Sequence, residues 1–203
     1  MEDFVYSHYT LPEGVTVETV EGGNKYKGRV WQELARQIFC EHGPEGSYRE
    51  IEHFESGAPF IYGSGNRISI SHTPGCFVAA SMPLPESADP AFFTPLAAPG
   101  IDVERKDRSK VKDLRERFLN SAELSLVNPD SVEANVLAWT CKEAMLKAYM
   151  NPTVNWRDNI VIEKLPEKGN PGKGRLTFGN ETVEFRLFLL PSDEFQITLA
   201  LPV

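Results

Sequence analysis

The sequence lacks the long apolar stretch that a membrane-spanning helix requires. No segment of its 203 residues approaches the roughly 18 consecutive apolar residues of such a helix. The chain begins with MEDFVYSHYT, which is acidic at its start and lacks the basic and then apolar segments of a signal peptide. We therefore expect a cytoplasmic protein without a membrane segment.

Cysteine is scarce, and its spacing argues against a cysteine-based scaffold. The three cysteines, Cys40, Cys76 and Cys141, lie far apart and form no CxxC pair. A zinc centre or a disulfide framework is therefore not expected. The sequence instead predicts three buried, reduced thiols, which behave as small apolar side chains.

An excess of positive charge is also missing. The net charge is −8, and the first 98 residues hold thirteen acidic residues against six basic ones. Such a chain is a poor candidate for binding nucleic acid, whose backbone is negatively charged. Four of the six basic residues nevertheless lie within twelve positions; they are Lys25, Lys27, Arg29 and Arg36. This cluster is compatible with a local anion site in an otherwise acidic protein.

The common phosphate-binding and serine-hydrolase motifs are absent as well. The chain contains neither a GxxxxGK[ST] loop nor a GxGxxG fingerprint. It has no GxSxG elbow, so a hydrolase with Ser71 or Ser81 as nucleophile is not favoured. Any phosphate site in this protein must therefore be built differently.

The segments that are present alternate between helical and strand-like patterns. Hydrophobic spacing predicts helices over residues 26–42, 108–119 and 131–150. Strand patterns occur in 3–20, 48–62, 67–71, 76–82 and 100–104 and in the C-terminal runs NIVIEKL, GRLTF with TVEFRLFLL, and FQITLALPV. A long helix and paired strands thus occur in each half. This repetition predicts an α+β fold of two similar subdomains.

A proline-rich segment separates the two halves. Residues 83–99 carry five prolines and show no helical periodicity, which is typical of a connection. We therefore predict an N-terminal subdomain over residues 1–98 and a C-terminal subdomain over residues 99–203.

The segment WTCKEAMLKA, residues 139–148, places few charged residues in an otherwise apolar helix. At 100° per residue, Trp139, Lys142, Glu143 and Lys147 fall within a sector of about 140°. The opposite side is small and apolar. A pair such as Glu143 and Lys147, four residues apart, often serves only to stabilise a helix. The segment alone does not decide between this role and an active-site role.

Two further segments carry polar side chains at strand positions. In GIDVE, residues 100–104, Asp102 and Glu104 share one face of the strand. Adjacent carboxylates either hold a divalent cation such as Mg²⁺ or lie on an exposed edge neutralised by Arg105 and Lys106. In RISISHTPG, the hydroxyl groups, the histidine and the turn amides could hold a phosphate, although a lone histidine is often structural.

Taken in order, these three segments resemble the motifs of the Sfp-type 4'-phosphopantetheinyl transferases. That family carries an ISHS-like element, GIDIE and WxxKExxxKA. The corresponding segments here are ISHT (70–73), GIDVE (100–104) and WTCKEAMLKA (139–148). The last is the most specific, and the three in sequence are stronger than any one alone.

The resemblance extends to weaker elements and covers roughly residues 25–165. The basic helix near residue 29 is similar to the first helix of the family. SGAPF (56–60) is similar to its GKP element, with Ala58 in place of lysine, and RFLNSAEL (117–124) is similar to its RFFxxxE segment. The chain length suits the two-subdomain, monomeric type.

The resemblance implies a fold and a reaction. The fold has two α/β subdomains, each a small antiparallel sheet packed on a long helix, related by a pseudo-twofold axis with the active site between them. The reaction moves the phosphopantetheine group of coenzyme A to a serine of an apo acyl or peptidyl carrier protein. It requires Mg²⁺, with Mn²⁺ as an alternative, and releases adenosine 3',5'-bisphosphate. No nucleic-acid or membrane partner is implied.

The resemblance also assigns roles by position. The implied metal ligands are Asp102, Glu104 and Glu143. Glu143 is also the candidate base for the carrier serine, and Lys147 is the candidate lysine for the pyrophosphate. The remaining residues implied to contact coenzyme A are Ser71, His72, Lys142, Lys25, Lys27 and Arg29.

Three features depart from the family pattern: Ala58, the long proline-rich connection and the acidic first half. They motivate an alternative, a non-catalytic module that binds coenzyme A or a partner. A Mg²⁺-dependent phosphodiesterase using the same carboxylates is a further alternative. A carrier would dock on basic residues of the second half, unless these form a solvated helix face paired with Asp113 and Glu116; they are Arg105, Lys106, Arg108, Lys110, Lys112, Arg115 and Arg117.

Overall fold

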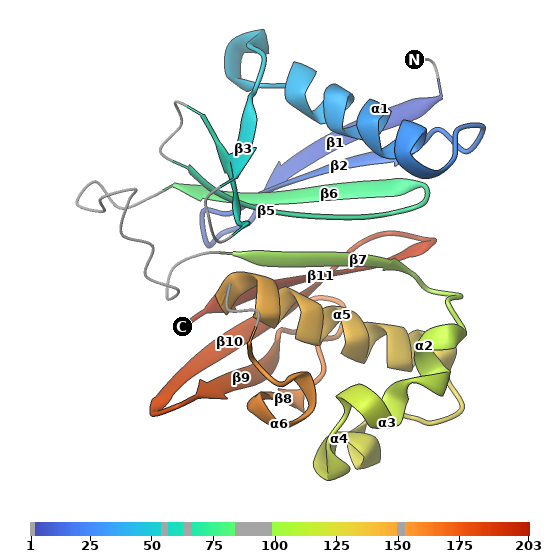
Figure 1. The fold of residues 1–203 in the computed structure, drawn as a ribbon, viewed down its shortest axis with the longest axis vertical. Helices are drawn as coiled ribbons and strands as arrows, with labels where there is room; N and C mark the ends of the chain where they lie inside the picture. Colours follow the sequence, from blue (N-terminus) through green and yellow to red (C-terminus); the bar gives the residue numbers. More distant parts are fainter. Residues whose placement is uncertain (1–2, 54–56, 63–65, 84–98, 150–152) are drawn as a thin grey trace. The chain divides into compact units, whose positions relative to one another are not determined.

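The computed structural model describes residues 3–53, 57–62, 66–83, 99–149 and 153–203. The chain divides into two compact units, residues 1–94 and 95–203 (Figure 1). The proline-rich connection predicted over residues 83–99, including the boundary after residue 98, lies outside the described residues apart from its two ends.

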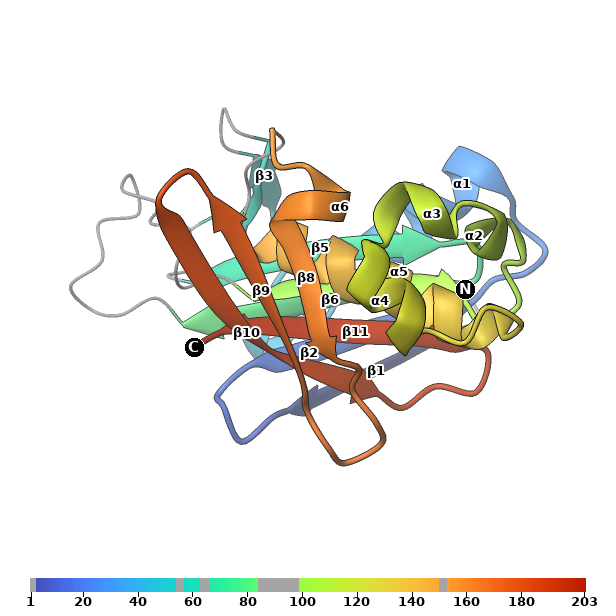
Figure 2. The ribbon, with the colours of Figure 1, turned by 90° about the horizontal axis from the view of Figure 1, so that it is seen from below.

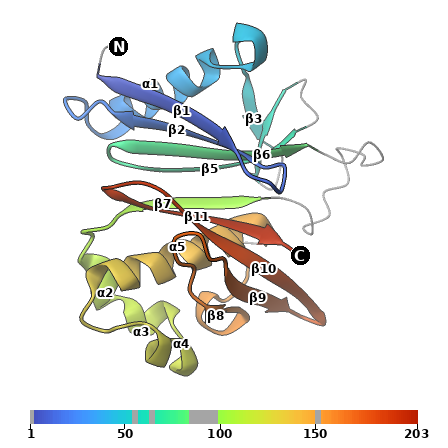
Figure 3. The ribbon, with the colours of Figure 1, turned by 180° about the vertical axis from the view of Figure 1, so that it is seen from behind.

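The first unit is a six-stranded antiparallel sheet with one long helix packed on it. Its strand order is β1-β2-β6-β5-β4-β3. Helix α1 follows β2 and covers one face of the sheet (Figure 3). The elements are β1 (Phe4–Thr10), β2 (Thr16–Gly22), α1 (Gly28–Glu41), the 3₁₀ turn η1 (Pro44–Gly46), β3 (Ile51–His53), β4 (Pro59–Ile61), β5 (Asn66–Thr73) and β6 (Cys76–Pro83).

Helix α1 is held on the sheet by one apolar face. Trp31, Ala35 and Phe39 recur at helical spacing and are buried against Val20 of β2 and Phe77 of β6. The indole nitrogen of Trp31 donates a hydrogen bond of 2.8 Å to the carbonyl of Gly22. The polar face of α1 therefore remains exposed.

The second unit repeats this plan with a five-stranded antiparallel sheet and the long helix α5. Its strand order is β7-β11-β10-β9-β8. Figure 2 shows the strands of this sheet with α6 beside β8. The elements are β7 (Gly100–Arg105), α2 (Lys110–Asp113), α3 (Arg115–Phe118), α4 (Ser121–Leu126), α5 (Val132–Tyr149), α6 (Trp156–Asn159), β8 (Ile160–Lys164), β9 (Gly172–Phe178), β10 (Glu181–Leu190) and β11 (Phe195–Pro202).

The predicted α+β fold, with an antiparallel sheet and one long helix in each half, is confirmed. The C-terminal runs NIVIEKL, GRLTF with TVEFRLFLL, and FQITLALPV are confirmed as the strands β8, β9, β10 and β11. One detail of the prediction is wrong, because the helix predicted over 108–119 is two short helices that meet at Leu114. Helices α4 and α6 were not predicted. Both are short and begin at asparagine caps, Asn120 and Asn155.

Two further predictions concern membrane-spanning helices and the state of the cysteines. No helix among them is both long and apolar enough to cross a membrane. Cys40, Cys76 and Cys141 are free and buried, as predicted. Burial raises the pKa of the Cys76 and Cys141 thiols well above the usual range, so both remain protonated.

Helix α5 lies directly on strand β7 at Gly100. A Cβ atom at this position would come within 1.9 Å of the carbonyl oxygen of Ala144 and 2.5 Å of the amide nitrogen of Ala148. Only glycine permits such an approach of two backbones. Gly174 plays a similar part on β9, where a Cβ would lie 2.5 Å from the sulfur of Met145. These contacts place the charged residues of α5 beside those of β7.

Candidate active site

The centre of the candidate site is formed by one strand and one helix. Asp102 of β7 is on the face that contacts α5, and its carboxylate accepts a 2.7 Å hydrogen bond from the ammonium of Lys147. Asp102 is buried, whereas the Lys147 side chain is 29% exposed. Glu143 lies one turn before Lys147 on the same helix. The structure thus brings together three of the residues predicted from the motifs.

Glu143 is the ionisable group with the most informative environment in this cluster. Its pKa is raised to about 7, first by burial and then by the negative charge of Asp102, and Lys147 offsets only part of the increase. At Glu143 the negative charge of Asp102 thus outweighs the opposing effect of Lys147. A partly buried carboxylate with such a pKa is typical of a general base or of a ligand for a cation.

Glu104 is buried on the same strand, but its carboxylate is engaged elsewhere. One oxygen accepts a 2.9 Å hydrogen bond from the amide of Arg105, and the other pairs with the guanidinium of Arg108. The alternative interpretation of GIDVE as an exposed edge is wrong, because Asp102 and Glu104 are 5% and 6% exposed. The Arg105 side chain instead pairs with Asp107 and Glu194.

The donor set fits a hard divalent cation in its chemistry, since such ions prefer carboxylate oxygens. Asp102 and Glu143 supply two carboxylates that lie close enough to influence each other. Across the described ranges, however, no three His, Cys, Asp or Glu side chains are grouped so that they could hold a metal ion. Glu104, the third ligand that the resemblance implies, is paired with Arg108 in this structure.

Lys142 lies in the core rather than in the site. Its side chain has no exposed surface, and its ammonium donates to Glu123 Oε2 at 2.7 Å, to the carbonyl of Ile160 at 2.7 Å and to the carbonyl of Trp156 at 3.0 Å. All three donors of the ammonium are thus used. This placement corrects the prediction that Lys142 shares a functional face with Glu143 and contacts coenzyme A.

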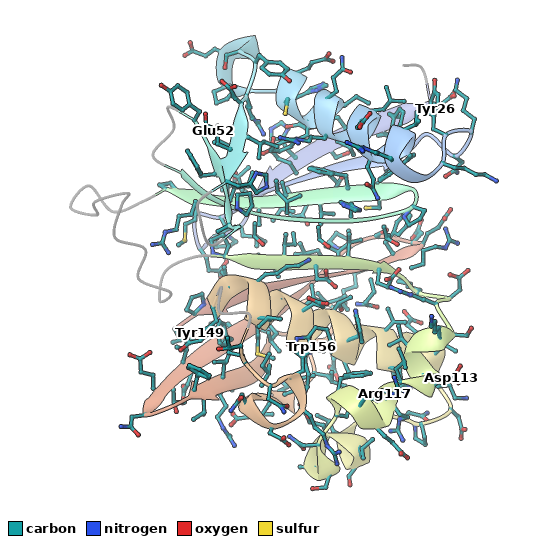
Figure 4. The ribbon with its side chains drawn as sticks, viewed as in Figure 1. Tyr26, Glu52, Asp113, Arg117, Tyr149 and Trp156 are labelled. Atoms are coloured by element: carbon teal, nitrogen blue, oxygen red, sulfur yellow. The ribbon has the colours of Figure 1, made fainter. Side chains whose placement is uncertain are left out.

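Glu123 is the partner that the sequence analysis missed. It is fully buried, forms a capping box with Asn120 at the start of α4, and accepts a 2.7 Å hydrogen bond from the amide of Ile162. The Asn-x-x-Glu spacing could have identified the cap. Trp139 lies edge-on to Phe118 and to Trp156, which Figure 4 labels beside α5. These contacts anchor α5 in the second unit.

The first unit contains a separate cavity of about 460 Å³, within the size range of small-molecule sites. Four basic or imidazole side chains line it, namely Arg29, Arg36, His53 and His72. Helix α1 provides the two arginines, and β5 provides His72 near its end. Gly57 and Pro59, the two neighbours of Ala58 in the chain, also line the cavity.

The remaining predicted coenzyme A residues do not line this cavity. Ser71 lies beside His72 on β5, so its side chain is on the opposite face, where it is buried. Lys25 pairs with Asp3, and Lys27 is the N-cap residue of α1. Conversely, no pattern in the sequence pointed to His53, which reaches the cavity from the short strand β3.

The basic residues considered for carrier docking are only partly available. Four of the seven have polar partners within the second unit: Arg105, Lys106, Arg108 and Arg115. Among the described residues, neither Asp113 nor Glu116 forms an ion pair, so the proposed solvated pairs are not present. Arg117 and Asp113 point outward from α3 and α2 in Figure 4. Within the part of the chain that the structure describes, the members of this group without a polar partner are Lys110, Lys112 and Arg117.

A protein family matches this chain, and the match covers most of the second unit. The family model described as the 4'-phosphopantetheinyl transferase superfamily matches residues 98–200, half of the chain. The chain belongs to this superfamily. A search of curated proteins finds no match. The matched range contains both GIDVE and WTCKEAMLKA and therefore Asp102, Glu143 and Lys147. Phosphopantetheine transfer follows as the general activity of this transferase, with coenzyme A and a carrier protein as its general partners.

Proposed function

We propose that this transferase moves 4'-phosphopantetheine from coenzyme A to a serine hydroxyl of an apo acyl or peptidyl carrier protein. We further propose that it requires Mg²⁺ and releases adenosine 3',5'-bisphosphate. The observation that carries the proposal is the cluster of Asp102, Glu143 and Lys147, in which a carboxylate with a pKa of about 7 lies beside an ammonium on the next helical turn. Transfer to phosphorus depends mainly on positioning and charge neutralisation, which this cluster can provide.

The reaction forms a bond between the serine oxygen and the phosphorus that carries pantetheine. It breaks the bond between that phosphorus and the oxygen bridging to adenosine bisphosphate. Glu143 accepts the serine proton, directly or through a water molecule. Lys147 uses one N–H to hold Asp102 and retains two for the phosphate oxygens of the leaving group. A Mg²⁺ ion, when bound by Asp102, Glu143 and Glu104, would neutralise pyrophosphate charge.

The first test is intact mass spectrometry of an apo acyl carrier protein after incubation with the transferase, coenzyme A and Mg²⁺. We expect a gain of one phosphopantetheine mass that disappears when a chelator is added. Binding of coenzyme A without any gain in mass, across several carriers, would instead support the non-catalytic module. Release of adenosine 3',5'-bisphosphate in the absence of a carrier would support the phosphodiesterase.

The first-unit cavity carries the proposal for coenzyme A phosphate binding, with Arg29, Arg36 and His72 as the contacting residues. Replacing His72 by alanine should raise the KM for coenzyme A by about tenfold and leave kcat nearly unchanged, because one hydrogen bond to a charged phosphate is lost. The control is His8→Ala, which removes an exposed histidine of the same unit that does not line this cavity. Equal KM values for the two variants would contradict the assignment of His72.

A further inference from the structure

Gln196 is a buried polar residue beside the candidate site to which no motif assigns a role. On strand β11 it lies directly opposite Glu104 of β7. Thr198, two residues further, is opposite Asp102, and its hydroxyl pairs with that of Thr140 on α5 at 2.8 Å. Alternate residues of a strand share a face. Gln196 therefore lies on the side of the sheet that carries Asp102, Glu104 and α5.

The side-chain amide of Gln196 has an unused donor. The residue is 2% exposed, and its Nε2 atom is buried without a hydrogen-bond partner among the described residues. A buried amide N–H that makes no hydrogen bond destabilises a fold, and such groups are rare in native structures. An apolar side chain of similar size, such as methionine, would fill this position without that cost. The amide therefore points to a role that the present arrangement of its neighbours does not use.

Glu104 is the neighbour whose carboxylate can exchange one of its present partners. Its carboxylate is held by Arg108, whose side chain is 46% exposed and lies four residues further along the chain. The guanidinium of Arg108 is the exposed partner and can move into solvent, whereas the buried Glu104 carboxylate then needs another cation in its place. If a divalent cation takes the place of Arg108, the Glu104 carboxylate exchanges this one contact on the strand face that Gln196 shares. An amide N–H donor opposite this carboxylate can then hydrogen-bond to it.

We propose that Gln196 is a positioning residue for Glu104. When the Glu104 carboxylate exchanges Arg108 for the divalent cation, the Gln196 amide donates a hydrogen bond to it and holds it toward Asp102. Groups that hydrogen-bond to metal ligands orient them and strengthen metal binding. The inference rests on the proposed function, because it takes Glu104 to be a metal ligand. It also accounts for the missing third ligand: Arg108 occupies Glu104 until the cation binds.

The test is a Mn²⁺ titration of the full-length protein, followed by electron paramagnetic resonance, with thermal unfolding of the metal-free protein in parallel. Gln196→Met should raise the melting temperature of the metal-free protein by about 2–4 °C and weaken Mn²⁺ binding about tenfold. It should lower kcat without changing the KM for coenzyme A. Arg108→Gln, a surface change, should strengthen Mn²⁺ binding about threefold because the competitor for Glu104 is removed.

Three results of these measurements would overturn the inference. A Gln196→Met variant that binds Mn²⁺ as tightly as the wild type would overturn the inference, whether the variant is more or less stable, because the amide would then be a structural group only. Unchanged Mn²⁺ affinity in Arg108→Gln would overturn the exchange of partners at Glu104. If the wild-type protein itself binds no Mn²⁺, the metal site of the proposed function fails, and the inference fails with it. The wild-type titration therefore separates the two failures.

Discussion

Replacing Glu143 by glutamine should reduce phosphopantetheine transfer by about a thousandfold, because the variant loses both a proton acceptor and a metal ligand. Glutamine has nearly the same size and remains able to fill the space beside Asp102. The loss should therefore appear in kcat and not in the fold. The assay is the rate of carrier modification measured by mass spectrometry under saturating coenzyme A. Full activity in this variant would contradict the role of Glu143.

The same substitution should stabilise the metal-free protein. The pKa of Glu143 is about 7 in the folded state and about 4.5 in its ordinary state, so the folded state binds more protons between these values. The stability of the wild type should then fall as the pH rises from about 4.5 to 7. At about pH 8, Glu143→Gln should gain on the order of 2–3 kcal/mol, or about 5–10 °C in melting temperature. Below about pH 4.5 the gain should disappear.

The matched control for Glu143→Gln is Glu133→Gln on the same helix. Glu133 is in the first turn of α5, its side chain is 62% exposed, and it faces Lys106 at 3.6 Å. An exposed pair of this kind contributes little to stability. Glu133→Gln should therefore change neither transfer nor the pH dependence of unfolding. A similar gain in both variants would show that the effect is one of overall charge.

Replacing Lys142 by methionine should have the largest effect on folding. The substitution leaves the carboxylate of Glu123 fully buried without its cation, and breaking such a pair typically costs about 3–5 kcal/mol. It also removes the donor for the carbonyls of Trp156 and Ile160. The free energy of unfolding, measured by chemical denaturation, should fall by that amount. Adding Glu123→Gln should recover much of the loss, because the buried charge is then removed.

Arg175→Met provides the comparison for Lys142→Met. Arg175 pairs with Glu163 across β9 and β8, and both side chains are more than 40% exposed. Breaking this exposed pair should cost at most about 1 kcal/mol. If Lys142→Met costs no more than Arg175→Met, the buried pair does not hold α4, α5 and β8 together in the way the hydrogen bonds indicate.

The contrast between Lys142 and Glu143 shows where sequence reasoning succeeds and where it does not. Helical and strand periodicity sufficed to predict the long helices and the α+β class, and the family resemblance implied that Asp102 and Lys147 belong to one site. A helical projection, however, gives only direction around an axis. Whether Lys142 is buried depends on α4 and on the α6–β8 connection, which pack around it. These short elements have too few residues for a periodic pattern, so nothing in the projection revealed the burial of Lys142.

The other gaps have a similar origin in long-range pairing. Gln196 faces Glu104 only because β11 pairs with β7 in one particular register. His53 and Arg36 line one cavity because β3 lies beside α1, where Arg36 donates a 3.1 Å hydrogen bond to the carbonyl of Ile51. Hydrophobic patterns specify which face of a strand is buried, but they leave its partner and register open until the sheet is known. Residues that are brought to a site by strand pairing therefore cannot be identified from the sequence around them.

The contact at Gly100 has a consequence for how this protein can vary. Most of its core consists of side chains, which can change in size and rearrange together with modest losses. At Gly100 there is no side chain between α5 and β7, so the two backbones are in direct contact and cannot move closer together. The spacing between the side chains of Lys147 and Asp102 is therefore set by this backbone contact and not by the surrounding core. Substitutions elsewhere in the core should erode stability well before they disturb the alignment of these two charges.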